Sequence, residues 1–324
     1  MNLKKIMLLI SAIVVMLIFI SKCYSYDGIK EFIIVDGLKR EYIVFQKEDR
    51  DGPHEKAPLL IVLHGGGGNG AKMQKMSGFD AIARHENLVT IYPDAVKNHW
   101  NDKRNDCNTY AHKNNIDDVE FLSKIIDEVK VKYNIDESRV YIAGVSNGGM
   151  MAHLFAIEKG GQIAAMASVI AGIAENIKDK KPAAALPVLI INGDKDMLVK
   201  WDGGVVAQNR GKILGARKSV EFWVNNNGCK KTPLVERLGD KDPGDGTVVI
   251  KETYAASDKG AEVVFYIIKG GGHCWPGKKA GLLYKWLISK NGEGGSVCMD
   301  INAADEIWNF FKTKKSAHIF QVNK

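Results

Sequence analysis

Three residue types that together can cleave an acyl bond occur along this chain in the order serine, aspartate, histidine. Ser146 stands in the motif Gly-Val-Ser-Asn-Gly, which follows a short apolar stretch and precedes a helix-forming run at 150–159. In that setting the motif predicts a nucleophile elbow, where Gly144 and Gly148 allow a tight turn and the hydroxyl projects alone. The following helix would point its first amides at an anion forming on the substrate. Ser146 is therefore the predicted nucleophile.

A serine of this kind needs a base and an acid that orients the base, and the chain supplies both in the expected order. Two aspartates, Asp194 and Asp196, follow the apolar stretch 188–191, and either can be the acid. We prefer Asp196, which lies further into the loop, whereas Asp194 fits a solvated turn carboxylate better. His273 follows the apolar stretch 263–268 on a loop with three glycines, and it is the predicted general base.

A glycine-rich loop, 64–70, follows the apolar stretch 59–63. It lacks the Gly-Lys-Ser/Thr sequence of a P-loop, so a phosphate cradle is disfavoured. In an esterase such a loop supplies backbone N–H groups to an oxyanion hole, together with the residue after the serine. We therefore predict Gly66 and Asn147 as the oxyanion donors, and expect His64 to brace the loop rather than act as a base.

Three tryptophans, Trp100, Trp201 and Trp275, lie in or beside the loops that should surround this site. Aromatic rings at such positions can stack on a phenolic acid or a sugar, so we list them as candidate substrate-binding residues. For each of them, packing within the loops is the alternative.

Strand-like and helix-like segments alternate along the chain, which predicts an α/β fold with a mostly parallel central sheet flanked by helices. The segment 225–257 is expected to be a hairpin elaboration, with strands at 234–238 and 248–254, and not a separate domain. The other expected strands are 33–35, 42–45, 59–63, 88–92, 140–143, 166–170, 188–191 and 263–268, and the expected helices are 73–84, 117–133 and 303–312.

The chain has 324 residues, of which 45% are apolar and 26% charged, which suits one large globular domain. Its start is basic, residues 6–20 are almost wholly apolar, and a short polar exit follows. This predicts a signal peptide at 1–25 and a single domain at 26–324, because the apolar run is shorter than a membrane span. An uncleaved anchor is the alternative, and lipoprotein processing at Cys23 fits less well because Lys22 precedes it. We expect a secreted or periplasmic protein with no stable membrane span after cleavage.

Cleavage would remove Lys4, Lys5 and Lys22 and no acid, so the net charge would fall from +7 to +4. The remaining charge is evenly spread, which argues against a nucleic-acid partner. Four cysteines would remain and could pair in one of three ways or stay as buried thiols. None has C-x-x-C spacing, and no metal or cofactor is expected. The sequence does not fix the oligomeric state or the pairing of Cys107, Cys229, Cys274 and Cys298.

With these motifs in place, the chain resembles the secreted esterase family that groups polyhydroxybutyrate-depolymerase-like proteins with feruloyl and acetyl-xylan esterases of the α/β-hydrolase fold. In that family's pattern the acid is the second aspartate of its loop, which supports Asp196. The resemblance runs in order through nearly the whole predicted mature chain. It rests on LHGGGG at 63–68, SGFD at 77–80, YPD at 92–94, WND at 100–102, DDV at 117–119, GVSNGGMM at 144–151, NGDKD at 192–196, GGGHCWPG at 270–277 and IWNFF at 307–311.

Two positions depart from the family pattern and bear on the shape of the pocket. Family members usually carry His-Gly-Thr where this chain has Asn-Gly-Asp at 192–194, and a small or hydroxylated residue in place of Cys274. The resemblance implies a serine esterase acting on feruloyl or acetyl esters of polysaccharide, or on short hydroxyalkanoate oligomers. The alternatives are a lipase or peptidase of the same fold, and a binding protein whose triad is idle. The polar loop 98–115 suits a polar substrate better than the apolar lid of a lipase.

Overall fold

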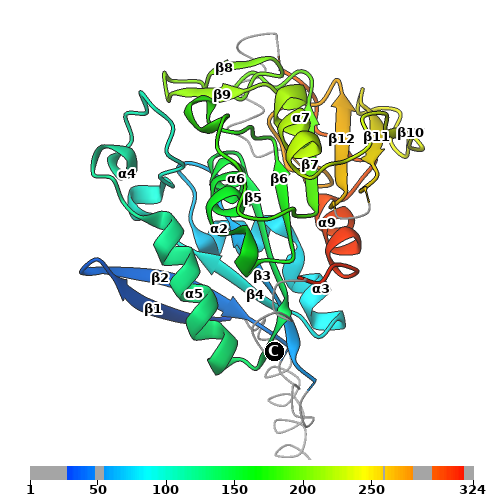
Figure 1. Cartoon of the computed structure of the whole chain (residues 1–324). Helices are drawn as coiled ribbons and strands as arrows, with labels where there is room; N and C mark the ends of the chain where they lie inside the picture. Colours follow the sequence, from blue (N-terminus) through cyan, green and yellow to red (C-terminus); the bar gives the residue numbers. More distant parts are fainter. Residues whose placement is uncertain (1–27, 48–54, 258–259, 280–293, 317–324) are drawn as a thin grey trace, which may run out of the picture.

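A ten-stranded sheet forms the centre of the molecule, in the order β1-β2-β4-β3-β5-β6-β7-β12-β11-β10 (Figure 1). The computed structural model describes residues 28–47, 55–257, 260–279 and 294–316, so the predicted signal peptide at 1–25 lies outside the described residues. The six strands from β4 to β12 in that order are parallel, and antiparallel pairs extend the sheet at both ends. The prediction of a mostly parallel α/β sheet is confirmed.

The strands of the main sheet are β1 Ile29–Val35, β2 Leu38–Phe45, β3 Ala57–Leu63, β4 Val89–Pro93, β5 Ile135–Val145, β6 Ala165–Val169, β7 Val188–Gly193, β10 Leu234–Arg237, β11 Val248–Tyr254 and β12 Val263–Lys269. A separate two-stranded sheet pairs β8 Gly203–Val205 with β9 Lys212–Leu214. The helices are α2 Gly70–Ser77, α3 Phe79–His85, α4 Tyr110–Lys113, α5 Asp118–Lys132, α6 Asn147–Lys159, α7 Ala216–Asn226 and α9 Ala303–Phe311, with short 3-10 turns η1 Val96–Asn98, η2 Gly160–Gln162 and η3 Glu175–Ile177.

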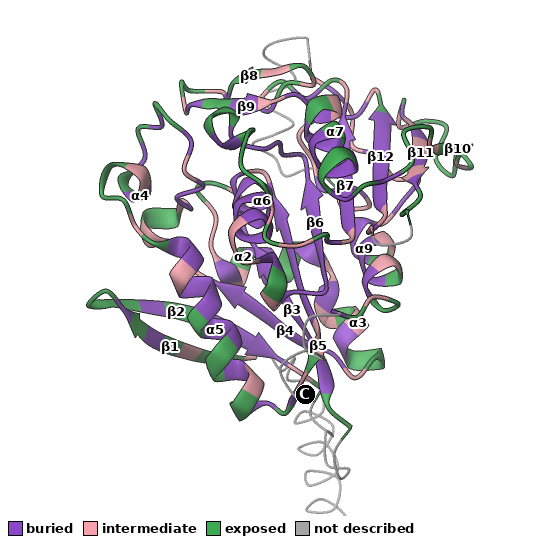
Figure 2. Cartoon of the chain, in the orientation of Figure 1, coloured by how far each residue is buried: buried purple, intermediate pink, exposed green. Residues whose placement is uncertain are grey.

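Helices cover both faces of the sheet because its central strands are apolar on both sides. Alternate residues of β3 enter different cores: Leu59 and Ile61 join the core under α5, α6 and α7, and Leu60 and Val62 the core under α2, α3 and α9. Every residue of β3 is buried, as in parallel sheets generally. Figure 2 shows the central strands buried and the exposed residues on the outer faces of the helices. None of the helices in the described ranges is long and apolar enough to cross a bilayer.

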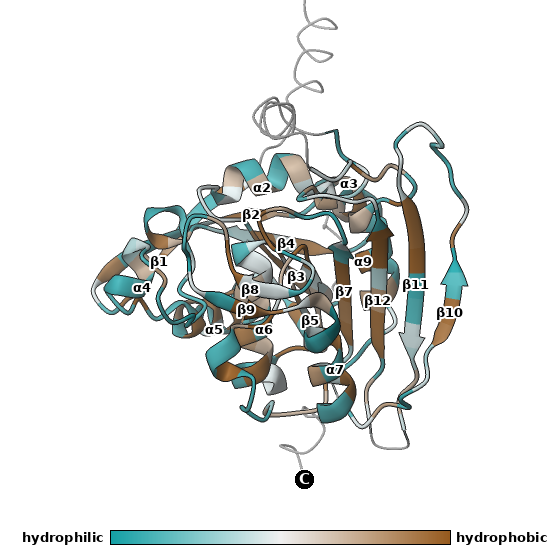
Figure 3. Cartoon of the chain, turned by 90° about the horizontal axis from the view of Figure 1, so that it is seen from above, coloured by the Kyte–Doolittle hydropathy of each residue, from teal (hydrophilic) through white to brown (hydrophobic). Residues whose placement is uncertain are grey.

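The two antiparallel ends of the sheet differ from its centre in composition. Strands β10 and β11 pair with each other and continue the main sheet beside β12, so the expected hairpin is present and forms an edge of the central sheet. Figure 3 shows hydrophilic stretches in these two outer strands. All four residues of β10 are exposed, which is consistent with an edge position.

The prediction of a single helix at 73–84 is wrong. The chain forms two helices there, because Gly78 adopts a left-handed conformation, with φ of 89°, that ends α2 and begins α3. A glycine reaches this conformation without steric cost, so the helix can break at that point. Helix α7 was not expected from the sequence at all.

Candidate active site

Ser146 lies on the turn between β5 and α6, as a nucleophile elbow requires. Its backbone has φ of 53° and ψ of −123°, a conformation that is strained for a residue with a side chain. The flanking glycines relieve the crowding that this turn creates. A Cβ on Gly144 would lie 2.2 Å from the carbonyl oxygen of Gly148, and a Cβ on Gly148 would lie 2.5 Å from the carbonyl oxygens of Leu63 and His64. No larger side chain fits at either position without moving backbone.

A chain of hydrogen bonds joins the serine, histidine and aspartate that the sequence singled out. The Nε2 atom of His273 lies 3.1 Å from Oγ of Ser146, and its Nδ1 atom lies 2.7 Å from Oδ2 of Asp196. A carboxylate only accepts, so Nδ1 carries a proton and Nε2 is left to accept from the serine hydroxyl. The three residues follow β5, β7 and β12, whose carboxyl ends meet at one edge of the sheet.

The two candidate acids have different surroundings. Asp196 is buried, and its second oxygen accepts hydrogen bonds from the amides of Leu198 and Val199, which fixes the carboxylate toward His273. Asp194 instead accepts from the amide of Gly270 at 2.7 Å, and lies 3.2 Å from Nζ of Lys269. The structure therefore brings Asp196 to the imidazole, and uses Asp194 to hold the start of the His273 loop.

The glycine-rich loop lies directly against the serine. A Cβ on Gly65 would come within 3.5 Å of Cβ of Ser146. The amides of Gly66 and Asn147 make no hydrogen bond to any other described residue, whereas the next amide, of Gly67, donates to Asn98. His64 is buried; its Nε2 accepts from the amide of Ala95, so this histidine braces the loop as expected.

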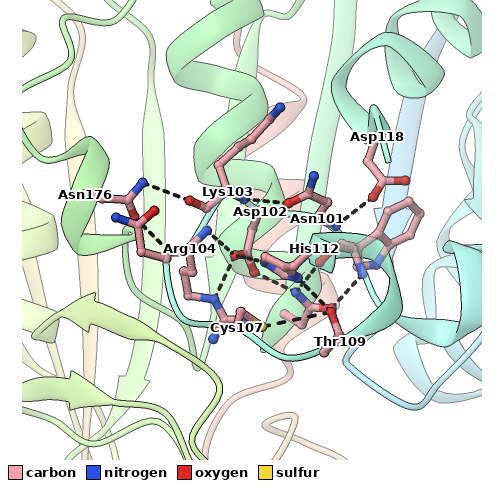
Figure 4. Close-up of polar contacts among 12 residues, drawn as sticks. Asn101, Asp102, Lys103, Arg104, Cys107, Thr109, His112, Asp118 and Asn176 are labelled. Carbon is pink, nitrogen blue, oxygen red and sulfur yellow. Dashed lines mark hydrogen bonds and ion pairs between the residues drawn. The ribbon is translucent and has the colours of Figure 1, made fainter. Parts of the chain in front are cut away.

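The side chain of Asn147 is fixed by a buried network that sequence analysis did not find. Figure 4 labels its members Asp102, Arg104, Thr109 and His112. Oδ1 of Asn147 accepts from the amide of Trp100 at 2.8 Å, and its Nδ2 donates to the carbonyl of Trp100 and to Oδ2 of Asp102 at 2.6 Å. Asp102 also binds Arg104 at 2.7 Å and His112 at 3.2 Å, and Nδ1 of His112 lies 2.7 Å from the Thr109 hydroxyl. The network thereby anchors the residue whose backbone amide follows the serine.

The electrostatics of this network follow from its pairing. Burial alone would raise the pKa of Asp102, but the charges of Arg104 and His112 lower that pKa to about 2. Burial would lower the pKa of His112, but its hydrogen bond to Asp102 prevails and raises the pKa to about 9. At neutral pH the carboxylate is therefore ionised and this imidazole is protonated. The only signal in the sequence was the motif Trp-Asn-Asp at 100–102. This motif does not show that Asp102 pairs with Asn147, which is 45 residues away.

A cavity of about 340 Å³ opens beside Ser146 and His273. Its walls combine the glycine loop with apolar side chains from α2 and from the ends of β5 and β6. Such a mixture of apolar walls and a few polar groups is typical of a small-molecule site. The lining residues are His64, Gly65, Gly66, Gly67, Gly68, Asn69, Lys72, Met73, Met76, Val145, Ser146, Ile170, His273 and Trp275.

The three candidate tryptophans occupy different places. Trp275 lines the cavity and makes an edge-to-face contact with Phe79. Trp201 is half-buried and stacks on Phe265, with 5.8 Å between ring centroids, away from the cavity lining. Trp100 is wholly buried and its indole N–H donates to the carbonyl of His64, so no face of the ring is open to a substrate. The prediction of a substrate contact is therefore wrong for Trp100, which packs under the glycine loop.

No disulfide joins the four cysteines that the structure describes, of which Cys107, Cys229 and Cys298 are buried. Within the described ranges one group of side chains has metal-ligand spacing, formed by Asp245, Cys298 and Asp300. Both carboxylates already accept backbone hydrogen bonds that link segments 241–247 and 299–300. These hydrogen bonds of Asp245 and Asp300 hold the two loops together.

The sheet topology and the turn at Ser146 are those of the α/β-hydrolase fold. An acetyl xylan esterase from Aspergillus awamori has the same fold, with a TM-score of 0.58 and 13% identity over 88% of this chain and 99% of that one. Residues 49–200 match the family described as esterase PHB depolymerase. The protein NocK of Nocardia uniformis subsp. tsuyamanensis, named as a candidate esterase, is 31% identical over 76% of this chain and 73% of its own length.

Two further relatives are named for an ester-cleaving activity. Feruloyl esterase B of Piromyces equi is 30% identical over 67% of this chain, which spans only 39% of that protein. Poly(3-hydroxyalkanoate) depolymerase C of Paucimonas lemoignei is 23% identical over 83% of this chain and 66% of its own length. The chain belongs to the PHB depolymerase esterase family, and it is a carboxylic ester hydrolase.

Proposed function

We propose that this chain is an exported serine esterase in which Ser146, His273 and Asp196 form the catalytic triad. The observation that carries the proposal is the continuous hydrogen-bonded path from Asp196 through His273 to Ser146 at the mouth of a cavity. Ser146 attacks the ester carbonyl carbon while His273 takes the hydroxyl proton, and Asp196 stabilises the imidazolium. The imidazolium then protonates the departing alcohol, which leaves an acyl group on Ser146. Water attacks this acyl carbonyl while His273 takes a proton from the water. His273 then returns the proton to the Ser146 oxygen as the acid is released.

The amides of Gly66 and Asn147 are the proposed donors to the oxyanion of the tetrahedral intermediate. Neither donates to another described residue, so both are available. Asn147 begins α6, so its amide carries the partial positive charge of a helix N-terminus. Removal of one such donor typically lowers kcat by about 10²–10³.

The proposed substrates are soluble or oligomeric esters: feruloyl or acetyl groups on polysaccharide, or short hydroxyalkanoate oligomers. The names of the relatives support these classes, and the apolar walls formed by Met73, Val145 and Trp275 suit an acyl chain or a phenyl ring. Export rests on the sequence of residues 1–25. N-terminal sequencing of the protein secreted by an expression host should find a chain that begins near residue 26.

The test is hydrolysis of p-nitrophenyl acetate and butyrate, methyl ferulate and a hydroxybutyrate trimer by the mature chain and by Ser146→Ala. We expect activity that falls by up to about 10⁶ in the variant, because no nucleophile remains. The ester that is cleaved most rapidly identifies which of the proposed substrate classes the enzyme prefers. Equal activity in both proteins would refute the triad assignment. A folded wild type inert toward all four esters would refute the proposed substrate classes and favour an unusual acyl substrate or a binding role.

A further inference from the structure

A second group of polar side chains contacts the glycine loop outside the cavity described above. A Cβ built on Gly66 would lie 3.2 Å from Nε2 of His99 and 3.7 Å from Nη1 of Arg210. Gly66 follows Gly65, which is in contact distance of Ser146. Neither His99 nor Arg210 lines the apolar cavity, so they form a different border of the same loop.

Positive charge exceeds negative charge in this region. Arg210 makes no ion pair with any described carboxylate, and its side chain donates only to the amide oxygen of Gln208. Arg104 and His112 share the single carboxylate of Asp102, which offsets one of their two charges.

The same charges act on His99. Burial lowers the pKa of His99, the hydrogen bond to the carbonyl of Lys97 opposes this, and the charges of Arg210, His112 and Arg104 lower that pKa further. A site that disfavours another cation in this way favours an anion for the same reason.

Two nitrogen atoms here are buried with no hydrogen-bond partner in the described part of the chain, namely Nε2 of His99 and Nη1 of Arg104. Buried polar atoms in folded proteins normally have partners, so the Nε2 atom beside Gly66 indicates where a ligand or water completes the site. Nδ1 of His99 faces the carbonyl of Lys97 at 3.2 Å, which directs Nε2 to Gly66.

We propose that Arg210, beside His99, forms a subsite for a carboxylate carried by the alcohol-derived part of the ester. The apolar cavity suits the acyl chain and is not lined by Arg210, so the charged end of the substrate is assigned to the Arg210 side of the loop. A hydroxy-acid oligomer with a free carboxyl end has this arrangement at its last ester bond, because the alcohol-derived unit of that bond bears the free carboxylate. This inference rests on the proposed esterase function and narrows its substrate class to carboxyl-terminated oligoesters.

The test compares two substrates of similar size that differ in charge, the 3-hydroxybutyrate trimer as free acid and as its primary carboxamide, which adds no further ester bond. In the wild type we expect kcat/KM to be at least tenfold higher for the free acid, mainly through KM, because a guanidinium binds a carboxylate by charge-assisted hydrogen bonds. Arg210→Gln should lower that ratio about tenfold, Arg210→Lys should restore part of it, and 0.5 M NaCl should reduce it. A wild-type ratio of one or less, or an unchanged ratio in Arg210→Gln, would overturn the proposal.

Lys97→Gln is the matched control, because it removes one exposed positive charge from the loop that carries His99 without touching Gly66. The ratio should stay within about twofold in this variant, and a fall equal to that of Arg210→Gln would show only a general effect of net charge. Calorimetric binding of both trimers to Ser146→Ala needs no turnover. Tighter binding of the free acid there supports the subsite even if the wild type does not hydrolyse the trimers, and equal binding counts against it.

Discussion

Two aspartate–histidine pairs lie close to Ser146, and each has a hydroxyl at the far ring nitrogen. In one, Asp196 holds His273 at 2.7 Å and His273 reaches Ser146 at 3.1 Å. In the other, Asp102 holds His112 at 3.2 Å and His112 reaches Thr109 at 2.7 Å. The residue types match those of a catalytic triad in both cases, but their surroundings differ.

The second pair, Asp102 and His112, is held in its ionised form. Asp102 is wholly buried and also binds Arg104 and Asn147, and the pKa of His112 is raised to about 9, so this imidazole cannot take a proton at neutral pH. Thr109 is buried and does not line the cavity, whereas Ser146 is half-exposed at its mouth. A hydroxyl, an imidazole and a carboxylate in sequence therefore do not define a catalytic site. A protonatable base and an open cavity are needed as well.

Replacing the histidine of each pair should give the largest difference in kcat between the two pairs. His273→Ala should lower kcat on p-nitrophenyl butyrate by about 10⁴ or more, because the proposed base is lost. His112→Gln should change it by less than about tenfold, since Arg104 continues to neutralise Asp102. Comparable losses in the two variants would mean that the second pair takes part in the chemistry.

Replacing Asp196 should lower activity, whereas replacing Asp102 should lower stability. Asp196→Asn should cost about 10⁴ in kcat with little change in stability, because an amide oxygen can still accept from Leu198 and Val199. Asp102→Asn should instead lower the free energy of unfolding by about 3–5 kcal/mol, because it leaves buried Arg104 and His112 without their carboxylate. Urea denaturation and steady-state kinetics on both variants check this; a stable, fully active Asp102→Asn protein would contradict it.

The smallest predicted effect is a pH dependence of stability. The folded chain holds a proton on His112 up to pH about 9, whereas the unfolded chain releases it near the ordinary value of 6.5. This contribution is complete below pH 6.5 and is lost as pH rises through 9, so the free energy of unfolding should fall by about 1–3 kcal/mol over that range. The pKa of Cys107 is lowered despite burial, chiefly by His112, and its titration opposes part of this loss.

Urea denaturation at pH 6.5, 7.5, 8.5 and 9.5 measures the slope. In His112→Gln the fall attributed to this histidine should be absent, and the difference between the two proteins isolates it from other titrating groups. Parallel curves for wild type and variant would show that His112 is not held protonated.

The sheet and the alignment of Ser146, Asp196 and His273 could be predicted because local patterns encode them. Buried parallel strands have continuous apolar sequences, and each of the three residues follows such a strand. The break at Gly78 was missed because a helical pattern of apolar residues continues through it. The packing of Trp100 under the glycine loop depends on a contact between residues far apart in the sequence, and so does the Asp102 network. Local sequence patterns do not predict such contacts.

Ser146 and His273 are 127 residues apart in the chain, and their contact exists only because β12 pairs with β7 within the sheet. Closing so long a loop costs conformational entropy that the strand pairing must offset. A chain that ends before β12 carries the serine without its histidine. In the proposed mechanism such a chain has no general base, so hydrolytic activity requires the whole sheet as far as β12.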